Sequence, residues 1–564
     1  MRKSTASSLL AVFSLALALR LSPLTRFVYF GSDVGEYFRI AHDLAATGHV
    51  SLAYPGWGVT YPYFPGMFFV VAGPAFAGLG LSGSLNLVVP ALGALIPALV
   101  FLVAGRVLHE DKAALVAAAF VGVAMPTVFQ TAHPLPATVG ELLAVAALLL
   151  LLRLPRDPRT WALLAPLTGA LVATHHLSAY FLIVMILIGL VVRALVRPLA
   201  DLREIRPQAL YVAFLTVLTL AYWFGYATTL GPAILPDMGV QSWWLPLVAI
   251  LVLVAALAAA ILLRRRSPWR YRPRYPSFRH VSAAYAIALV STLAIMAWGV
   301  AFGVPGTGIR LPPAVLTYFL PFFAFLAFSG AGRKHGDFGR HGLEVSGWFL
   351  ALVLSMAFGA IVAPQVIVPY RHMEYVLIVL AIFIGAGFAR VVELGGIERR
   401  RMAASGIVAV LVAGSALSAF PPPGLLVNFE EGARPAALDA SYWAGDHVDG
   451  LLATDHRAST LAFGFGGVDA TWDTAPLAIT APDFASARAE MCAVSSPSGV
   501  RRVDYVLIDA DLASGVQLSP FDPALPLSDA ARAKYPDLPY QKVFDSGYAQ
   551  VYFVNWGYAG APCP

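Results

Sequence analysis

The sequence carries little charge for its length. Only 12% of its 564 residues are Asp, Glu, Lys or Arg, whereas soluble domains average about 25%. Apolar residues make up 59% of the chain, and the mean hydropathy is +0.72. This shortage of charge excludes an ordinary soluble protein and indicates a polytopic membrane protein.

Cysteine is also scarce, and several familiar catalytic motifs are missing. The only two cysteines are Cys492 and Cys563, and neither has the spacing of a metal ligand. The chain has no Gly-rich phosphate loop, no Ser nucleophile elbow and no HExxH sequence. No motif for nucleic acid is present. A disulfide between the two cysteines would suit an oxidising outer compartment, and two free thiols are the alternative.

Apolar runs long enough to cross a membrane recur through the first 420 residues. Lys and Arg gather in loops 153–159, 193–206, 264–279, 333–341 and 398–401, which predicts that these loops are cytoplasmic. Working backwards from these loops, the loop near 106–112 must also be cytoplasmic. With the N-terminus cytoplasmic as well, an odd number of crossings must separate this loop from the outer loop after the first helix, so one apolar run there does not span. Thirteen of fourteen runs are therefore expected to cross; they begin near Ala6, Gly66, Ser84, Ala113, Ala137, Trp161, Ser178, Leu210, Trp243, Val281, Leu311, Val345, Glu374 and Met402.

The composition changes at the PPPG sequence of residues 421–424. The region from Pro421 onward has 8 basic and 17 acidic residues, a net charge of −9, against +15 for the first 420 residues. Short strand-like runs, LLAT, VDYVLIDA and AQVYFV, appear there. We predict an all-α polytopic membrane domain over residues 1–420, with about 13 transmembrane helices and an outer loop at 23–65. A C-terminal extracytoplasmic α/β or α+β domain is predicted over residues 421–564.

The outer loop contains a dense group of polar side chains in the sequence GSDVGEYFR. Asp33 and Glu36 would share one face of a helix, and such a carboxylate pair can hold a divalent cation such as Mg or Mn, or supply a general base. Alternatively, Ser32 or Asp33 caps a helix and Glu36 lies in its first turn. Arg39 either pairs with Asp33 or Asp43, or binds a phosphate.

A second cationic position lies at the outer end of a late helix, in the sequence VPYRHMEYVL. Arg371 is predicted to lie on the side of the membrane where basic residues are disfavoured, so a local binding partner is expected for it. Its planar guanidinium matches the oxygens of a lipid-carrier phosphate, with Tyr370 and His372 beside it. The alternative is a structural ion pair with Glu374.

Two further groups in the membrane domain are candidates for metal or acceptor binding. His133 and Glu141 occur in TAHPLPATVGELL, and His175 and His176 occur in the short hairpin ATHHLSAY. A carboxylate in a membrane segment indicates function, although Glu141 could instead make an interhelical hydrogen bond. The histidines could be ordinary loop or hairpin residues, and adjacent rings on a helix seldom bind one metal.

In the C-terminal region, three adjacent polar residues follow the strand-like run LLAT. Asp455, His456 and Arg457 are candidates for contacts with an acceptor, if they face the membrane domain. The alternative is that they are surface residues at the end of a strand.

The sequences GSDVGEYFR, YPYFPG and YRHMEY, in this order, resemble the GT-C superfamily of integral-membrane glycosyltransferases. This superfamily includes oligosaccharyltransferase catalytic subunits and dolichyl-phosphate-mannose protein mannosyltransferases. Asp33 and Arg39 have the spacing of the acidic residue and Arg in the oligosaccharyltransferase loop. The tail, with YWAGDHVDGLLATDHR and VFDSGYAQVYFV, resembles the outer domains of archaeal members, although the WWD-type acceptor motif is absent.

The resemblance implies transfer of a sugar from a polyprenyl-phosphate donor to a glycan, lipid or protein acceptor on the outer face of the plasma membrane. Asp33 would orient or deprotonate the acceptor, and Arg371, together with Arg39, would neutralise the leaving phosphate. The competing hypotheses are a transporter or flippase for a lipid-linked glycan, and a non-catalytic scaffold whose outer domain binds a partner.

Overall fold

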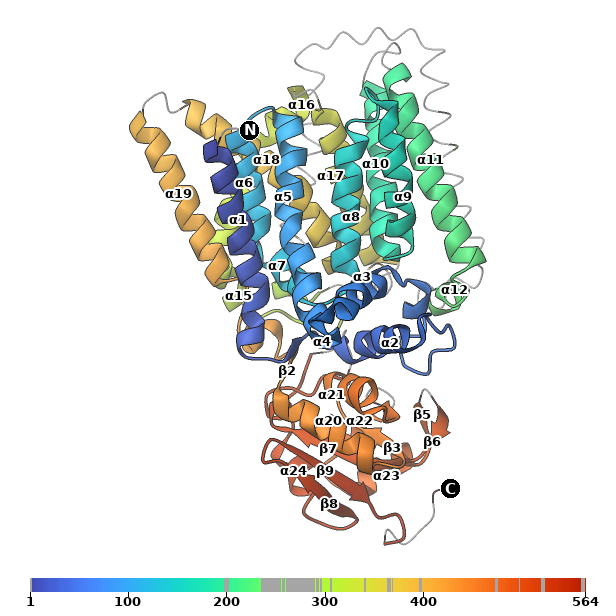
Figure 1. Ribbon diagram of the computed structural model, residues 1–564. Helices are drawn as coiled ribbons and strands as arrows, with labels where there is room; N and C mark the ends of the chain where they lie inside the picture. Colours follow the sequence, from blue (N-terminus) through green and yellow to red (C-terminus); the bar gives the residue numbers. More distant parts are fainter. Residues whose placement is uncertain are drawn as a thin grey trace.

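The computed structural model shows a bundle of long helices with a smaller domain of helices and strands at one end (Figure 1). Short helices of the N-terminal loop lie between these two parts. Apart from a few isolated positions, the structure describes residues 3–196, 202–234, 297–304, 307–338, 341–362, 369–394, 398–471, 475–496, 498–518 and 523–558.

The bundle consists of apolar helices. Among the described residues, six helices are long and apolar enough to cross a membrane, or seven if the bent pair α6–α7 forms one span. The protein is therefore a multi-pass membrane protein, while the count of thirteen stays a prediction, and the runs from Trp243 and Val281 lie outside the described residues. The bounds are α1 (Lys3–Leu21), α5 (Val89–Leu108), α6 (Asp111–Val123), α7 (Met125–Ala132), α8 (Pro136–Leu151), α9 (Trp161–Val172), α10 (His176–Val196), α11 (Leu202–Gly225), α12 (Leu230–Ile234), α15 (Ala314–Tyr318), α16 (Leu320–Phe338), α17 (Gly342–Val362), α18 (Met373–Leu394) and α19 (Glu398–Leu417).

The two apolar runs after the outer loop differ in length. The first, Gly66–Leu79, is a short apolar helix, whereas Leu81–Leu108 is long enough to span. This difference agrees with the single crossing that the charge pattern requires here. The first run comprises α3 (Gly66–Pro74) and the π-helical turn η3 (Ala75–Leu79), and α4 (Leu81–Gly83) and η4 (Ser84–Val88) lead into α5.

Close helix packing in the bundle depends on small residues. Along α18, every side chain from Val376 to Ile384 is at most 3% exposed, so this helix is central. It packs on α16, where a Cβ on Gly332 or Gly387 would lie 1.8 Å from a carbonyl oxygen of the opposite helix. Membrane helices associate through such close backbone approach, because lipid provides no hydrophobic force between them.

The outer loop forms a helix that lies across the end of the bundle (Figure 1). After β1 (Tyr29–Phe30), α2 runs from Val34 to Thr47. Its apolar residues recur three to four positions apart, as in an amphipathic helix. That face packs on α3, and the buried contact consists of Tyr37, Ile40, Ala41, Leu44, Met67, Phe68 and Val71.

The C-terminal domain contains a five-stranded mixed sheet, with β7 in its centre. The strand order is β4-β3-β7-β9-β8; β3 is parallel to β4 and β7, and β9 is antiparallel to β7 and β8. The strands are β2 (Gly432–Ala433), β3 (Leu451–Ala453), β4 (Ala470–Thr471), β5 (Val494–Ser496), β6 (Gly499–Arg501), β7 (Val503–Asp509), β8 (Tyr540–Asp545) and β9 (Ala549–Val554). The helices are α20 (Pro435–His447), α21 (His456–Leu461), η10 (Ala462–Gly466), α22 (Pro476–Thr480), α23 (Phe484–Cys492), η11 (Ala510–Ala513) and α24 (Asp529–Ala533).

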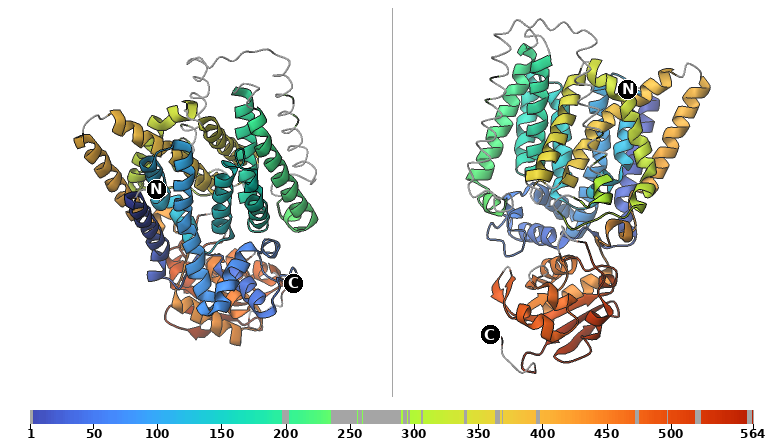
Figure 2. Two further views of the ribbon diagram at one scale, coloured as in Figure 1. Left: turned by 45° about the horizontal axis from the view of Figure 1, so that its top comes forward. Right: turned by 180° about the vertical axis from the view of Figure 1, so that it is seen from behind.

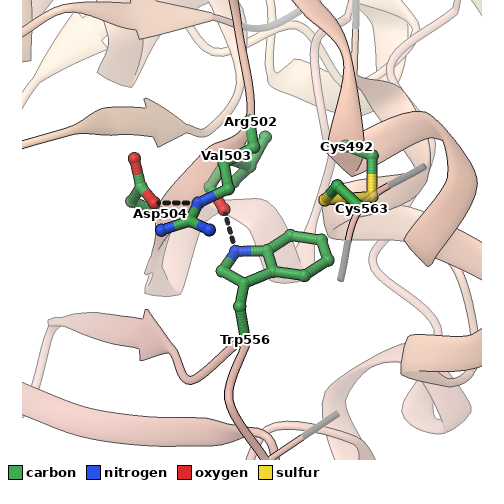
Figure 3. Close-up of a disulfide and its surroundings, with 6 residues drawn as sticks. All are labelled: Cys492, Arg502, Val503, Asp504, Trp556 and Cys563. Carbon is green, nitrogen blue, oxygen red and sulfur yellow. Dashed lines mark hydrogen bonds and ion pairs between the residues drawn. A yellow bond between two sulfur atoms is a disulfide. The ribbon is translucent and has the colours of Figure 1, made fainter. Parts of the chain in front are cut away.

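A disulfide joins Cys492, the last residue of α23, to Cys563 near the C-terminus. Beside it, the indole of Trp556 donates a 2.9 Å hydrogen bond to the carbonyl of Val503, and the Arg502 guanidinium lies over the indole ring (Figure 3). The disulfide therefore ties the end of the chain to α23, while Trp556 holds the preceding segment against the start of the central strand β7.

We expect Cys563→Ser to destabilise the C-terminal domain by about 2–5 kcal/mol, because the unfolded domain gains conformational freedom. Hydrogen exchange of β7 and β9 in the full-length protein measures this change. Cys492→Ser is the matched control and should have the same effect. Equal protection of wild type and both variants would contradict a stabilising bridge, and mass spectrometry without reductant would detect free thiols.

Candidate functional site

The backbone before Asp33 is held by the first segment of the C-terminal domain. β1 pairs antiparallel with β2, with Tyr29 opposite Ala433 and Phe30 opposite Gly432. The N–H of Ser32 then donates a 2.9 Å hydrogen bond to Glu431 Oε2. Figure 2 (right) shows from behind that the N-terminal loop lies between the bundle and the C-terminal domain. Asp33 therefore lies where the two parts meet.

The Asp33 carboxylate contacts groups from both parts of the protein. Asp33 occupies the N-cap position of α2, but its side chain makes no capping hydrogen bond. Its Oδ1 lies 2.9 Å from Nε2 of His456, and its Oδ2 accepts hydrogen bonds of 3.4 Å from the hydroxyls of Tyr37 and Tyr61. The Asp33 side chain remains 29% exposed. It is therefore positioned, yet open to a reactant.

Electrostatics favour the ionised form of Asp33. Burial, the largest single influence, would raise its pKa, but the hydrogen bond and charge of His456, the charge of Arg371 and the Tyr37 hydroxyl together lower it below 3.8. For His456, burial favours the neutral form, yet the contact with Asp33 raises its pKa above 6.5. At neutral pH, Asp33 is a carboxylate that only accepts hydrogen bonds.

Arg371 supplies positive charge to the same region. It lies in the 3₁₀ turn η8 (Pro369–His372), directly before α18, and it is exposed. Its charge acts on Asp33 and also on His175 and His176. A cation whose charge acts on an ionised carboxylate gives the site a place for an anionic group and a place for a proton donor.

The neighbours of Arg371 in the sequence have different surroundings. His372 is fully buried, and its Nε2 lies 2.9 Å from the hydroxyl of Ser355, which in turn lies 2.9 Å from the hydroxyl of Tyr180. This chain of polar groups links η8 to α17 and α10. Tyr370 belongs to η8, but its side chain lies outside the described part of the chain. Their predicted contacts with a phosphate stay predictions.

His175 and His176 lie beneath the aromatic turn of the outer loop. The Nδ1 of His175 is 2.7 Å from the hydroxyl of Ser178, and the ring of His176 lies 5.3 Å from that of Phe64. The two imidazole rings are 5.3 Å apart and inclined by 50°. They therefore face different neighbours, as expected for adjacent residues at the start of a helix.

Glu36 organises the loop that follows α2. It is 2% exposed and accepts hydrogen bonds from the Tyr54 hydroxyl at 2.6 Å and from the N–H groups of Gly58 at 3.2 Å and Trp57 at 3.4 Å. Burial raises its pKa, which the Tyr54 bond opposes. Glu36 thus lies in the first turn of α2, as the helix-start alternative predicted, and its oxygens are engaged by loop 54–58.

Arg39 pairs with Asp43, one turn further along α2. The distance from Nε to Oδ2 is 3.2 Å, and both side chains are about one-third exposed, at 36% and 34%. The sequence allowed Arg39 to pair with Asp33 or with Asp43, and in the structure it pairs with Asp43. Its role toward a phosphate stays a prediction.

His133 and Glu141 lie in separate environments. The His133 ring stacks on Phe30 with centroids 4.4 Å apart, and its Nε2 is 3.9 Å from Oε2 of Glu431. Burial lowers the pKa of His133 below 6.5 despite this carboxylate. Glu141 is fully buried in α8, where it interacts electrostatically with Arg20 and Glu374. These contacts join α8 to α1 and α18.

Asp33 and Glu36 are the residues predicted to hold a divalent cation. Among the described residues, no three His, Cys, Asp or Glu side chains lie close enough together to hold a metal ion. The two best oxygen donors, Asp33 and Glu36, are engaged by His456 and by Tyr54 respectively. The predicted Mg or Mn ion stays a prediction, and no chemical step below depends on one.

Parallel strands bring the C-terminal polar residues together. Asp455 follows β3 and caps α21 by accepting the N–H of Ala458 at 2.9 Å. Asp509 ends the neighbouring strand β7 and forms a 2.5 Å ion pair with Arg457, in which both side chains are at most 2% exposed. Of the three predicted acceptor residues, His456 thus contacts the membrane part. Asp455 and Arg457 instead make contacts at the C-terminal ends of strands β3 and β7.

We expect Arg457→Met to destabilise the C-terminal domain by about 3–5 kcal/mol, because Asp509 would remain buried without its partner. Hydrogen exchange of β3 and β7 in the intact protein measures the effect. The matched control is Arg502→Met, which removes an exposed pair with Asp504 and should cost only about 0–1 kcal/mol. Equal losses in both variants would contradict the importance of the buried pair.

Three tyrosines of the site were not predicted from the sequence. Tyr37 lies one helical turn after Asp33, a spacing at which side chains meet, so it could have been found. Tyr61 begins the YPYFPG turn and Tyr54 the YPGW turn, both noted only as aromatic turns. Their contacts with Asp33 and Glu36 depend on how the loop folds back, which no local pattern specifies.

Comparisons with known proteins show the fold. No family model matches the sequence, and no curated protein matches it. Among solved structures, the archaeal oligosaccharyltransferase AglB from Archaeoglobus fulgidus, in complex with an inhibitory peptide and a dolichol-phosphate, has a TM-score of 0.58 and 14% identity, covering 90% of this chain and 69% of AglB. The apo form of the A. fulgidus oligosaccharyltransferase has a TM-score of 0.57.

A second type of structure matches nearly the whole chain. ArnT from Cupriavidus metallidurans in the apo state has a TM-score of 0.51 and 15% identity, covering 99% of this chain and 100% of ArnT. AglB and ArnT are both GT-C glycosyltransferases. This chain therefore has the GT-C fold, and the resemblance seen in its sequence is confirmed at the level of the fold.

Proposed function

We propose that this protein is a membrane glycosyltransferase that moves a sugar from a polyprenyl-phosphate donor to an acceptor, on the side of the membrane where the C-terminal domain lies. The observation that carries this proposal is the Asp33 carboxylate. It is ionised, 29% exposed and held at the junction of the two parts, with the charge of Arg371 acting on it. An anion-binding cation and a proton acceptor are the two groups that such a transfer needs.

In the proposed reaction, a hydroxyl or amide group of the acceptor attacks the anomeric carbon of the donor sugar. A bond forms between the acceptor atom and this carbon, and the bond from the carbon to the phosphate oxygen breaks. The proton of the acceptor passes to Asp33, and the polyprenyl phosphate leaves with the electron pair. No oxidant or reductant takes part.

The lowered pKa of Asp33 determines how it contributes. A carboxylate with such a low pKa is a weak base in the ground state, because general-base catalysis is most efficient near the operating pH. Asp33 therefore acts first by accepting a hydrogen bond that aligns the acceptor. It takes the proton late, when the attacking atom has become acidic.

Arg371 is proposed to hold the leaving phosphate. Its planar guanidinium can donate two parallel hydrogen bonds to a phosphate, and its position before α18 puts the charge where the bundle meets the loop. The dolichol-phosphate bound to AglB supports a lipid-phosphate donor for this fold. The identity of the sugar and acceptor is left open.

The orientation follows from the distribution of charge. The basic loops predicted as cytoplasmic place the N-terminus inside and the C-terminal domain outside. The start of α1 and the C-terminal domain lie at opposite ends of the bundle (Figure 1), as this orientation requires.

Purified protein in lipid nanodiscs, supplied with a polyprenyl-phosphate sugar and candidate acceptors, tests the proposal. The expected result is release of polyprenyl phosphate together with a glycosylated acceptor. A protein that moves the intact lipid-linked sugar across a liposome membrane, without cleaving it under any acceptor condition, would instead be a transporter.

A further inference from the structure

We propose that His456 of the C-terminal domain is a positioning residue for Asp33, so that docking of this domain completes the site. The proposal rests on the proposed glycosyl transfer and assigns a role to a residue from the second domain. Its basis is the 2.9 Å contact between His456 Nε2 and Asp33 Oδ1, which joins residues 423 positions apart.

The chemistry of the contact fixes its direction. An ionised carboxylate only accepts hydrogen bonds, so the hydrogen lies on Nε2 of His456, whether the ring is neutral or protonated. His456 thereby occupies Oδ1 and leaves Oδ2 toward the hydroxyls of Tyr37 and Tyr61. One oxygen of Asp33 is used for positioning, and the other faces the two tyrosine hydroxyls, whose 3.4 Å contacts an acceptor group would share or replace.

The interface around this contact is closely packed, as a positioning role requires. The backbone of α2 approaches α21 and η10 directly: a Cβ on Gly35 would lie 1.8 Å from the Thr460 carbonyl oxygen, and one on Gly464 would lie 2.1 Å from the Gly35 carbonyl oxygen. The Thr460 hydroxyl donates a 2.5 Å hydrogen bond to the carbonyl of Ser32. Only glycine allows this approach, so the helix that carries His456 is fixed against the helix that Asp33 begins.

The outer loop is also attached at a second point. The indole N–H of Trp57 donates a 2.8 Å hydrogen bond to the carbonyl of Ala470 in β4. Together with the β1–β2 pairing, this bond connects the C-terminal domain to both ends of the loop that contains Asp33. A change in docking would therefore move His456 relative to Asp33.

Several other charged or titratable groups act on this pair, and they limit how a pH effect can be read. Glu431 before β2 and Asp455 beside His456 both favour the charged imidazole, and Arg371 favours the ionised Asp33. Since these groups remain in every variant below, a difference between variants reports on His456 itself.

The decisive comparison replaces His456 with Met, which fills a similar volume without a donor, and with Gln, whose side-chain N–H can replace Nε2–H. His447→Met is the matched control, because His447 is an exposed residue on α20. His456→Met should reduce kcat for sugar transfer by about tenfold or more, with a smaller change in the KM for the donor. His456→Gln should keep most of the wild-type kcat, because its amide N–H can donate to Asp33. His447→Met should behave like wild type.

A second measurement does not depend on activity. A hydrophobic carbodiimide modifies only protonated carboxyl groups, so the pH dependence of Asp33 labelling, read by mass spectrometry, reports its protonation. In His456→Met the midpoint should move to higher pH, because only Arg371 and Tyr37 then oppose the effect of burial on the pKa of Asp33. The acidic limb of the rate profile should move with it. His456→Ala provides a second donor-free variant if the Met protein does not fold.

An unchanged labelling midpoint in the donor-free variants, or a Gln variant as impaired as Met, would overturn the positioning role. If wild type transfers no sugar from any donor, but the midpoint shifts as expected, the contact is established and the proposed function fails instead. The two failures are therefore distinguishable.

Discussion

Asp33→Asn is expected to slow sugar transfer by about 10²–10⁴-fold, the usual contribution of a general base, while donor binding changes little. Asparagine has nearly the same shape and can still contact the hydroxyls of Tyr37 and Tyr61, but it cannot take a proton. Single-turnover transfer, measured with saturating donor, separates this effect from binding.

Asp43→Asn is the matched control, since Asp43 lies on the same helix and pairs with exposed groups. Its transfer rate should equal that of wild type. The pKa of Asp33 lies below 3.8, so the wild-type rate should hold as pH falls and be lost only when pH passes through that lowered pKa. Wild-type turnover in the Asp33→Asn protein would show that Asp33 is not the base.

Arg371→Ala should weaken binding of a polyprenyl phosphate by about 10–150-fold, which corresponds to the roughly 1.5–3 kcal/mol of a charged hydrogen bond. Arg371→Lys should recover part of this loss, because an ammonium keeps the charge but cannot form the two-pronged contact. Isothermal titration with polyprenyl phosphate in detergent measures both.

Two arginines serve as comparisons for Arg371. Arg502→Ala removes an exposed side chain of the C-terminal domain and should leave phosphate affinity unchanged. Arg39→Ala should have a small effect, because Arg39 pairs with Asp43 on an exposed surface. Wild-type affinity in the Arg371→Ala protein would exclude the phosphate clamp, and a large loss in the Arg39→Ala protein would assign that role to Arg39 instead.

Much of the architecture was accessible from sequence because it depends on composition. Apolar runs and basic loops predict a membrane bundle, and the acidic tail with strand-like runs predicts a separate domain. The GT-C fold was recognised from short motifs around Asp33 and Arg371. The length of each apolar run was harder to interpret, because Gly66–Leu79 is as apolar as a span but too short to be one.

The site itself was only partly predictable. Asp33 could be identified as a candidate because a carboxylate beside a membrane segment indicates a function. His456 was proposed for acceptor contacts, and its bond to Asp33 could not be foreseen, because it requires the docking of two distant segments. From the sequence alone, Asp455 and Arg457 could not be distinguished from His456 as candidates. In the structure their side chains are buried inside the C-terminal domain, where Arg457 forms an ion pair with Asp509.

The pairing of β1 with β2 also sets the order in which the protein can mature. Tyr29 and Phe30 leave the ribosome early, but their partners Gly432 and Ala433 are made some four hundred residues later. His456 follows later still. During synthesis, Asp33 therefore lacks its contact with His456 until the C-terminal domain has been made and has folded. By the proposed mechanism, a half-made chain would transfer sugar more slowly than the finished protein, so full activity would report that the C-terminal domain has docked.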